Sequence, residues 1–217
     1  MISRNINLDD RCLLFFIKSP EKGKVKSRLA SVIGDERAAN LYRDFITQML
    51  STLRRGDFPF HICFYPHNAL KGVKEWLGDE HHYIPQKGKD LGERMSNAFR
   101  KAFDTGFKRV VLVGSDIPDL PLEVIEEAFI SLKEEDAAIG PAYDGGYYLI
   151  GFKEKTFSPQ VFERMAWGTE RVFEDTMKVL KNLNQRVHTL PFRRDIDTIE
   201  DLKHLGTGTS LNLPSDK

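Results

Sequence analysis

The stretch VLVGSDIPDLP, residues 111–121, joins the end of an apolar segment to a loop that carries acidic residues. Its apolar residues run without interruption into Gly-Ser-Asp, which places Asp116 at the carboxyl edge of a predicted central strand. Pro118 then turns the chain out into a loop, because proline has a fixed φ and no backbone donor. Capping the next helix accounts for Asp119 but not for Asp116. Because ligands of open α/β sheets bind beyond the carboxyl ends of the strands, Asp116 is expected at a ligand crevice.

Short apolar runs on both sides of this stretch alternate with segments of helical period, a pattern typical of an α/β domain with a largely parallel sheet covered on both faces. Three such segments have apolar stripes, which include Phe45, Phe99 and Val124. Only AYDGGY separates the fifth and sixth runs, too few residues for a helical crossover, so one strand there is expected to be antiparallel. The predicted strands are 12–17, 60–65, 82–85, 109–114, 136–141, 147–152 and 186–192.

The 217 residues are expected to form one domain over 11–205, preceded by an arm at 1–10 and followed by a flexible tail at 206–217. Basic and acidic residues balance at 32 each, so no global field favours nucleic acid or a membrane surface. No apolar run has membrane-spanning length and no signal peptide is visible, which predicts a cytoplasmic protein. Cys12 and Cys63 lie in predicted strands and are expected to be buried free thiols.

The stretch KSPEKGKVKSRLA, residues 18–30, concentrates positive charge directly after the first predicted strand. Pro20 and Gly23 discourage a helix, and in an extended loop alternate side chains project to the same side. Converging ammonium and guanidinium groups suit a polyphosphate, although a solvated basic loop is the alternative. Neither a P-loop nor a dinucleotide-binding GxGxxG sequence is present. The side chains expected to converge are Lys22, Lys24, Lys26 and Arg28.

The segment QKGKDLGERMSNAF, residues 86–99, enters a predicted helix after the third strand. Asp90 and Glu93 have the spacing of a capping box, which accounts for both residues without a ligand. A glycine-containing turn at a helix N-terminus, with Lys87, Lys89 and Arg94 nearby, is equally a second anion site.

Two further segments offer aromatic side chains. GPAYDGGYYLIGF, residues 140–152, has the composition of a hairpin turn around Asp144, and its tyrosines are candidates for lining a sugar or base pocket. MAWGTE, residues 165–170, adds Trp167 and Thr169, which by themselves are explained as core and cap.

Acidic residues near the C-terminus are the candidate partners of Asp116 in a metal site. Thr198 and Asp201 have capping-box spacing, which leaves Asp195 and Asp197 surplus to local needs. Mg²⁺ and Mn²⁺ take one or two protein carboxylates and complete their shell with water and substrate phosphate. The six histidines show no zinc-ligand spacing.

Taken in order, six segments over residues 11–205 resemble a bacterial family of predicted glycosyltransferases of the GT-A superfamily. These proteins are also described as nucleotide-diphospho-sugar transferases, and some are associated with arsenosugar biosynthesis. The same segments are similar to 2-phospho-lactate guanylyltransferase and to the molybdenum-cofactor nucleotidyltransferases. The segments that carry the resemblance are KSPEKGKVKSRLA, KGKDLGERM, GSDIPDL, GPAYDGGYYLIG, WGT and DIDTIEDL.

The resemblance implies a three-layer α/β/α domain with a mostly parallel mixed sheet, which binds a nucleotide and Mg²⁺ or Mn²⁺ at the carboxyl edge. Asp116 would stand in place of the superfamily's Asp-x-Asp, and Asp197 would be the second metal ligand. GSD keeps only the last acid of Asp-x-Asp, the form seen in nucleotidyltransferase relatives. Candidate nucleotide-binding or substrate-binding residues are Lys18, Lys24, Lys26, Arg28, Gly92, Arg94, Tyr147, Trp167 and Thr169.

Three hypotheses follow. The first is a glycosyltransferase that uses a nucleotide sugar and a small-molecule acceptor, with Asp116 and Asp144 as catalytic residues. In it, Asp144 would bind or deprotonate the acceptor hydroxyl. The second is a nucleotidyltransferase that uses a nucleoside triphosphate, and the third is a nucleotide-sugar binding protein without turnover. The sequence leaves open the base, the sugar, the acceptor, the stereochemistry and the oligomeric state.

Overall fold

The computed structural model describes residues 10–205. All of its strands belong to one seven-stranded sheet of order β3-β2-β1-β4-β6-β5-β7, in which β6 is antiparallel to both of its neighbours and the other pairs are parallel. The strands are β1 Arg11–Lys18, β2 Phe60–Tyr65, β3 His82–Pro85, β4 Arg109–Val113, β5 Ala137–Pro141, β6 Tyr147–Lys153 and β7 Val187–Thr189. The seven predicted strands and the mixed sheet are therefore confirmed.

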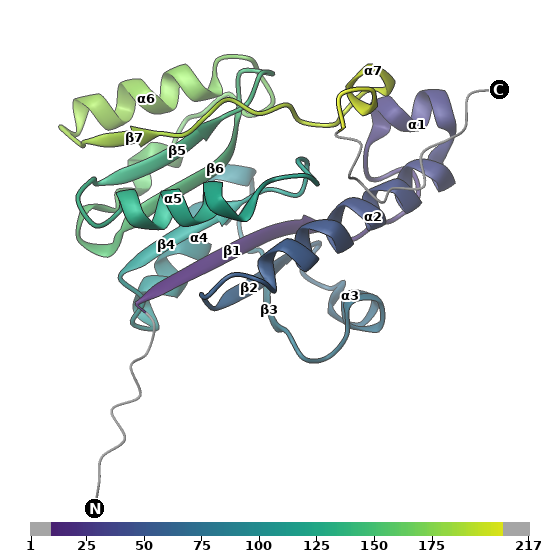
Figure 1. The fold of residues 1–217 in the computed structure, drawn as a ribbon, viewed down its shortest axis with the longest axis horizontal. Coiled ribbons are helices and arrows are strands. Elements are labelled where there is room, and N and C mark those ends of the chain that lie inside the picture. The colour runs from purple at the N-terminus through teal and green to yellow at the C-terminus, as the bar shows by residue number, and fades with distance from the viewer. Residues whose placement is uncertain (1–9, 206–217) are drawn as a thin grey trace, which may run out of the picture.

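Helices cover both faces of the sheet and produce a three-layer α/β/α fold, as expected. In Figure 1, α2 and α5 lie in front of the sheet and α4 lies behind it. The helices are α1 Ser27–Ile33, α2 Asp35–Leu53, α3 Leu70–Leu77, α4 Leu91–Asp104, α5 Leu122–Ser131, α6 Val172–Asn182 and α7 Ile199–Leu202, with short 3₁₀ turns at Glu154–Thr156 and Pro159–Phe162.

The side chains of β1 alternate between the two faces of the sheet and contribute to a hydrophobic core on each face. Leu13 and Phe15 contribute to the core under α2 and α5, whereas Leu14 and Phe16 contribute to the core under α4 and α6. Successive side chains of a strand point to opposite faces, so a strand covered on both faces must be apolar throughout. The predicted helical stripes are buried as well, with Phe45 and Phe99 fully enclosed.

Several smaller expectations can be compared with the same coordinates. Cys12 and Cys63 are buried free thiols, as predicted. The predicted arm and tail lie outside the described residues, apart from residue 10. Within residues 10–205, no helix is long and apolar enough to cross a membrane.

Candidate active site

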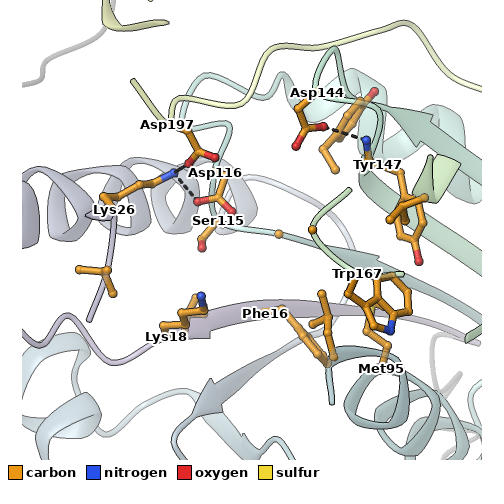
Figure 2. A pocket seen from close by; sticks show the side chains of 18 of the residues that line it. Phe16, Lys18, Lys26, Met95, Ser115, Asp116, Asp144, Tyr147, Trp167 and Asp197 are labelled. Atoms are coloured by element: carbon orange, nitrogen blue, oxygen red, sulfur yellow. Dashed lines mark hydrogen bonds and ion pairs between the residues drawn. The ribbon is translucent and has the colours of Figure 1, made fainter. Parts of the chain in front are cut away.

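A cavity of about 460 Å³ opens at the carboxyl edge of the central strands. Figure 2 shows its two parts: a charged group around Lys26, Asp116 and Asp197, and a group of larger apolar and aromatic side chains that includes Trp167 and Met95. Of the residues predicted from the sequence, Lys18, Lys26, Arg28, Arg94, Asp116, Asp144, Tyr147, Trp167, Thr169 and Asp197 line the cavity.

The charged part is built around one buried ammonium group. Lys26 Nζ lies 2.5 Å from Asp116 Oδ1 and 2.9 Å from Asp197 Oδ1, and its side chain is only 3% exposed. The two carboxylates are 47% and 42% exposed and border the cavity. Residues 81 positions apart therefore meet at one cation, the Lys26 ammonium; that they also share a divalent ion stays a prediction.

The conformation of the loop before α1 differs from the extended arrangement expected for the basic stretch. Lys26 adopts the left-handed conformation (φ 48°, ψ 49°) and α1 begins at Ser27, so the alternation of side chains ends there. Lys22 pairs instead with Glu36 on the surface, and Lys24 is exposed and does not line the cavity. The prediction that four basic residues converge was wrong for these two lysines, because after the turn at Lys26 and the start of α1 only Lys26 and the exposed Arg28 of the four line the cavity.

Burial and neighbouring charges shift the ionisation of this group in different directions. Burial alone would lower the pKa of Lys26, but the carboxylates of Asp116 and Asp197 raise it above its ordinary value. Burial would raise the pKa of Asp116, yet Lys26 holds it below the ordinary range. Burial, together with the charges of Asp116 and Asp144, raises the pKa of Asp195 to about 8, and its Oδ1 is buried without a hydrogen bond among the described residues. Asp195 therefore takes up a proton at a higher pH than an ordinary carboxyl group does.

A hydrogen-bond chain joins the ends of β1 and β4 beneath this group. The Lys18 backbone N–H donates to the Tyr42 hydroxyl at 3.0 Å, and that hydroxyl lies 2.8 Å from Ser115 Oγ. Burial raises the pKa of Tyr42 to about 12, so its hydroxyl stays protonated. Sequence reasoning missed both residues. The signal for Tyr42 was a hydroxyl-bearing residue next to the apolar stripe of a helix, and the signal for Ser115 was its place beside Asp116 in the Gly-Ser-Asp turn.

Gln86 was also missed as a site residue. It follows β3, is buried, and donates from Nε2 to the carbonyl oxygens of Ile17 at 3.1 Å and Cys63 at 2.7 Å. Two carbonyl acceptors fix which end of the amide carries nitrogen, because only the NH₂ group can donate to both. The side chain thus holds β1 and β2 together where it lines the cavity.

The apolar part of the cavity continues the core under α4. Phe16 and Met95 come from that core, and the rings of Tyr147 and Trp167 meet edge to face with centroids 6.4 Å apart. Gly92 does not line the cavity, but it permits the close approach of Trp167, since a Cβ there would lie 2.8 Å from the indole and 2.3 Å from a backbone oxygen. Its role is therefore to position the wall rather than to contact a ligand.

Asp144 lies on the β6 side of the cavity, away from Lys26 (Figure 2). Its Oδ1 accepts the Gly146 N–H at 2.8 Å, a local turn interaction that matches the alternative role expected for it. A Cβ on Gly145 would lie 2.0 Å from the Glu170 carbonyl oxygen, so this loop packs tightly against the segment that carries Trp167. The structure therefore gives Asp144 both a turn contact and a place in the cavity wall.

The N-terminus of α4 is capped by the protein itself. The Asp90 carboxylate accepts a hydrogen bond from the Glu93 N–H at 2.8 Å, as the spacing predicted. The Glu93 carboxylate in turn accepts from the Lys89 N–H, at 2.8 Å, rather than from the N–H of the cap residue. Arg94 lines the cavity with its guanidinium 4.3 Å from the centroid of the Tyr65 ring. The capping interpretation is thus realised, and Arg94 remains available at the cavity wall.

The donor set fits a divalent cation held jointly by protein and substrate. Among residues 10–205, no group of three or more histidine, cysteine, aspartate or glutamate side chains has the geometry of a metal site. Two carboxylate oxygens nevertheless converge on a single positive centre. Mg²⁺ normally binds one or two protein carboxylates and takes its remaining ligands from water and substrate phosphates. The carboxylates of Asp116 and Asp197 fit such an ion.

The fold and this edge of the sheet define a protein of the nucleotide-diphospho-sugar transferase fold. Residues 48–169 match the family described as "Uncharacterized protein conserved in bacteria (DUF2064)", and the chain belongs to this family. A crystal structure from Desulfovibrio desulfuricans G20, provisionally named a nucleotide-diphospho-sugar transferase, is 48% identical with a TM-score of 0.88, covering 91% of this chain and 86% of that one. No curated protein matches the chain.

More distant structures share the fold alone. The 4-diphosphocytidyl-2C-methyl-D-erythritol synthase of Anaerococcus prevotii DSM 20548 is 14% identical with a TM-score of 0.58, covering 91% of this chain and 95% of that one. Rv0371c of Mycobacterium tuberculosis H37Rv, in complex with manganese, is 14% identical with a TM-score of 0.57, covering 91% and 97%. Of these structures, only the one that is 48% identical shares more than the fold, and its name is that of a transferase.

Proposed function

We propose that the protein, through the single domain of residues 11–205, is a metal-dependent glycosyltransferase that moves a sugar from a nucleotide diphosphate sugar to a small-molecule acceptor. The observation that carries the proposal is the convergence of Asp116 and Asp197 on Lys26 at the carboxyl edge of the sheet. The provisional name of the relative that is 48% identical supports the same donor class.

The charged part of the cavity would bind the diphosphate of the donor. Asp116 and Asp197 would hold Mg²⁺ or Mn²⁺, which supplies positive charge to the diphosphate as it leaves. Once the carboxylates bind that ion, Lys26 would turn to a phosphate oxygen. Lys18 and Arg28 line the same cavity, and such preorganised cations stabilise charge that develops in the transition state without proton transfer.

The opposite wall would receive the acceptor. Asp144 lies there with one carboxylate oxygen engaged in the turn, and the other would accept the proton of an acceptor hydroxyl. Tyr147, Trp167 and Thr169 line the cavity around it and would contact the transferred sugar or the acceptor. The separation of Asp144 from the Lys26 group matches a reaction with a donor on one side and an acceptor on the other.

Nucleotidyl transfer is the second candidate. The Gly-Ser-Asp turn has Gly114 where Asp-x-Asp has its first acid, so only Asp116 presents a carboxylate there, the form that the resemblance associates with nucleotidyltransferases. In that reaction the acceptor would attack the α-phosphate of a nucleoside triphosphate and pyrophosphate would leave. A non-catalytic nucleotide-sugar binding protein is the third candidate.

A thermal-shift screen separates the three. The protein would be melted with Mn²⁺ and nucleoside diphosphates, nucleoside triphosphates or nucleotide sugars, because a ligand of the native state raises the Tm. Stabilisation by nucleotide sugars with later release of nucleoside diphosphate supports glycosyl transfer. Stabilisation by triphosphates with release of pyrophosphate overturns it in favour of nucleotidyl transfer. Binding without turnover over a broad acceptor set favours the third candidate.

Asp144→Asn tests the acceptor side. The amide keeps an oxygen for the Gly146 N–H, so the turn should persist, but it cannot accept a proton as a base. Nucleotide affinity should be unchanged while kcat falls by about 100-fold. The exposed Glu170, on the adjoining segment, offers Glu170→Gln as a matched control with wild-type kcat. Wild-type turnover in Asp144→Asn would restrict Asp144 to the turn.

A further inference from the structure

Two aromatic side chains outside the cavity lining form an exposed pair. Tyr143 is 64% exposed and Phe192 is 52% exposed, and their ring centroids lie 5.6 Å apart with planes tilted by 35°. We call this pair the aromatic platform. Exposed apolar side chains that adjoin one another and have a polar rim are a candidate ligand-binding surface, whereas singly scattered ones are not.

The surrounding residues hold the platform in place. Phe173 packs edge-on against Phe192 with centroids 6.1 Å apart, and the Arg194 guanidinium lies 5.3 Å from the centroid of the Tyr143 ring. Arg194 also reaches Asp201 at 3.4 Å, which restrains it from the other side. The rings are therefore presented on a prepared surface, which lowers the entropy a ligand must lose on binding.

The platform is continuous with the acceptor side of the cavity. Tyr143 directly precedes Asp144, and Phe173 directly follows Val172; Asp144 and Val172 both line the cavity. The Phe173 N–H donates to the Gly145 carbonyl oxygen at 2.8 Å, which joins the start of α6 to the Asp144 loop. A molecule whose hydroxyl reaches Asp144 can therefore extend onto Tyr143.

We propose that the aromatic platform is an outer subsite that binds a pyranose ring of the acceptor, so that the acceptor is a glycoside or oligosaccharide rather than a free monosaccharide. A pyranose offers an apolar C–H face to the rings, and its hydroxyls can hydrogen-bond to the Arg194 guanidinium at the rim. The inference rests on the proposed glycosyl transfer, because it specifies the acceptor of that reaction.

The test uses saturation-transfer NMR on the full chain with cellobiose, lactose and maltose as probes and glucose for comparison. Tyr143→Leu, Phe192→Leu and the double variant keep apolar bulk but lose the aromatic faces. Ile130→Ala is the matched control, because Ile130 is 62% exposed on α5 and does not line the cavity. Tyr143→Phe keeps the face and should behave as wild type.

We expect at least one disaccharide to bind wild type more tightly than glucose does, and the double variant to lose about tenfold in its affinity for that disaccharide. The Tm of each variant shows whether the fold persists. Absence of disaccharide binding in wild type, or equal binding in the double variant, overturns the proposal.

Nucleotide binding by thermal shift, measured on the same samples, keeps the two proposals distinguishable. If the disaccharide binds through the platform but no nucleotide binds, the donor hypothesis fails and the platform stands. If nucleotide sugars bind and react while the double variant keeps its disaccharide affinity, the platform fails and the donor hypothesis stands. Binding of the disaccharide in the absence of nucleotide and Mg²⁺ is part of the expected result.

Discussion

Charged side chains are paired differently at the amino edge and at the carboxyl edge of the sheet. At the amino edge, acids and bases balance: Arg109 Nη2 lies 2.5 Å from Asp10 Oδ1, Lys108 Nζ lies 2.6 Å from Glu154 Oε2, and the Asp136 carboxylate is shared by two cations, Lys153 and Arg186. At the carboxyl edge, one buried lysine is shared by two carboxylates, and the buried carboxyl of Asp195 lies beside them.

This difference indicates that the charged groups of the carboxyl edge serve function rather than stability. Exposed single pairs contribute little to stability and their replacement is tolerated. A buried ammonium that serves two carboxylates is costly to desolvate and leaves an excess of acidic groups around one cation. Such local conflict is expected at functional sites, where the arrangement serves a ligand rather than the fold alone. Substitutions at the two edges should therefore have different consequences.

The largest effect is expected from the two carboxylates. Asp116→Asn or Asp197→Asn should weaken Mn²⁺ binding in the presence of a nucleoside diphosphate by about 100-fold, because an amide is a poor ligand for a hard cation. The double variant should lose little more, since the two groups act as a unit. Calorimetric titration with Mn²⁺ measures this.

Asp119→Asn is the matched control for that titration, because Asp119 is an exposed acid of the same loop that does not line the cavity. Normal Mn²⁺ affinity in Asp116→Asn would remove the metal site and most of the case for a transferase. Normal affinity in Asp197→Asn alone would move the second ligand to Asp195.

Lys26→Met is expected to have two smaller effects of opposite sign, on Mn²⁺ affinity and on nucleotide affinity. Without the competing ammonium, the free protein should bind Mn²⁺ about tenfold more tightly. Nucleoside diphosphate affinity should fall by about tenfold, because a charge-assisted hydrogen bond is lost. Lys22→Met removes a cation outside the cavity and should change neither. Unchanged Mn²⁺ affinity in Lys26→Met would show that the lysine does not compete with a metal.

His61, near the amino edge, should make stability pH-dependent. Burial, and to a smaller extent the charges of His82 and Lys101, lower the pKa of His61 from 6.5 to about 4. The folded protein then binds fewer protons than the unfolded chain between these values, so stability is full above about pH 6.5 and falls as the pH drops toward 4. His61→Gln should lessen this loss by about 1–2 kcal/mol after solvent screening.

Urea unfolding at pH 7, 6, 5 and 4 gives the free energy of unfolding of wild type and of His61→Gln. The difference between the two proteins isolates the His61 contribution, because the contributions of all other titrating groups cancel. Parallel stability curves would contradict the lowered pKa of His61. Nucleotide affinity should be equal in the two proteins at pH 7, because His61 does not line the cavity.

The smallest effect is expected from the surface pairs of the amino edge. Glu154→Gln breaks the exposed pair with Lys108 and should change the free energy of unfolding by less than about 1 kcal/mol. Nucleotide and Mn²⁺ binding should be unaffected. A loss of nucleotide affinity in this variant would mean that the two edges are coupled, contrary to the contrast between them.

The strands were predictable to within one or two residues at most of their ends. The runs of the central strands are largely apolar, as required of strands buried on both faces, and the AYDGGY connection was too short for anything but an antiparallel neighbour. The seventh strand is shorter than its apolar run, Val187–Thr189 against 186–192. The Leu190 N–H still donates to the Ile139 carbonyl oxygen, but Pro191 has no N–H to continue the ladder, and pairing resumes only at an isolated bridge between Ala142 and Arg193.

Helix α1 was not predicted. Pro20 and Gly23 indicated an extended loop through Arg28, whereas the chain turns at Lys26 and becomes helical from Ser27. Proline and glycine affect the backbone conformation of their own position and of their immediate neighbours. They therefore could not exclude a helix that begins several residues later.

The sequence by itself determined the strand pattern, the position of Asp116 at a strand end and the surplus of acids near Asp197, because these depend on local periodicity and local caps. Only the tertiary structure decided that Lys26 joins the two carboxylates, that Gln86 ties β1 to β2, and that Tyr143 and Phe192 form a surface beside Asp144. These contacts link residues distant in the chain. Their geometry depends on strand order and on how each loop leaves the sheet, which no local pattern encodes.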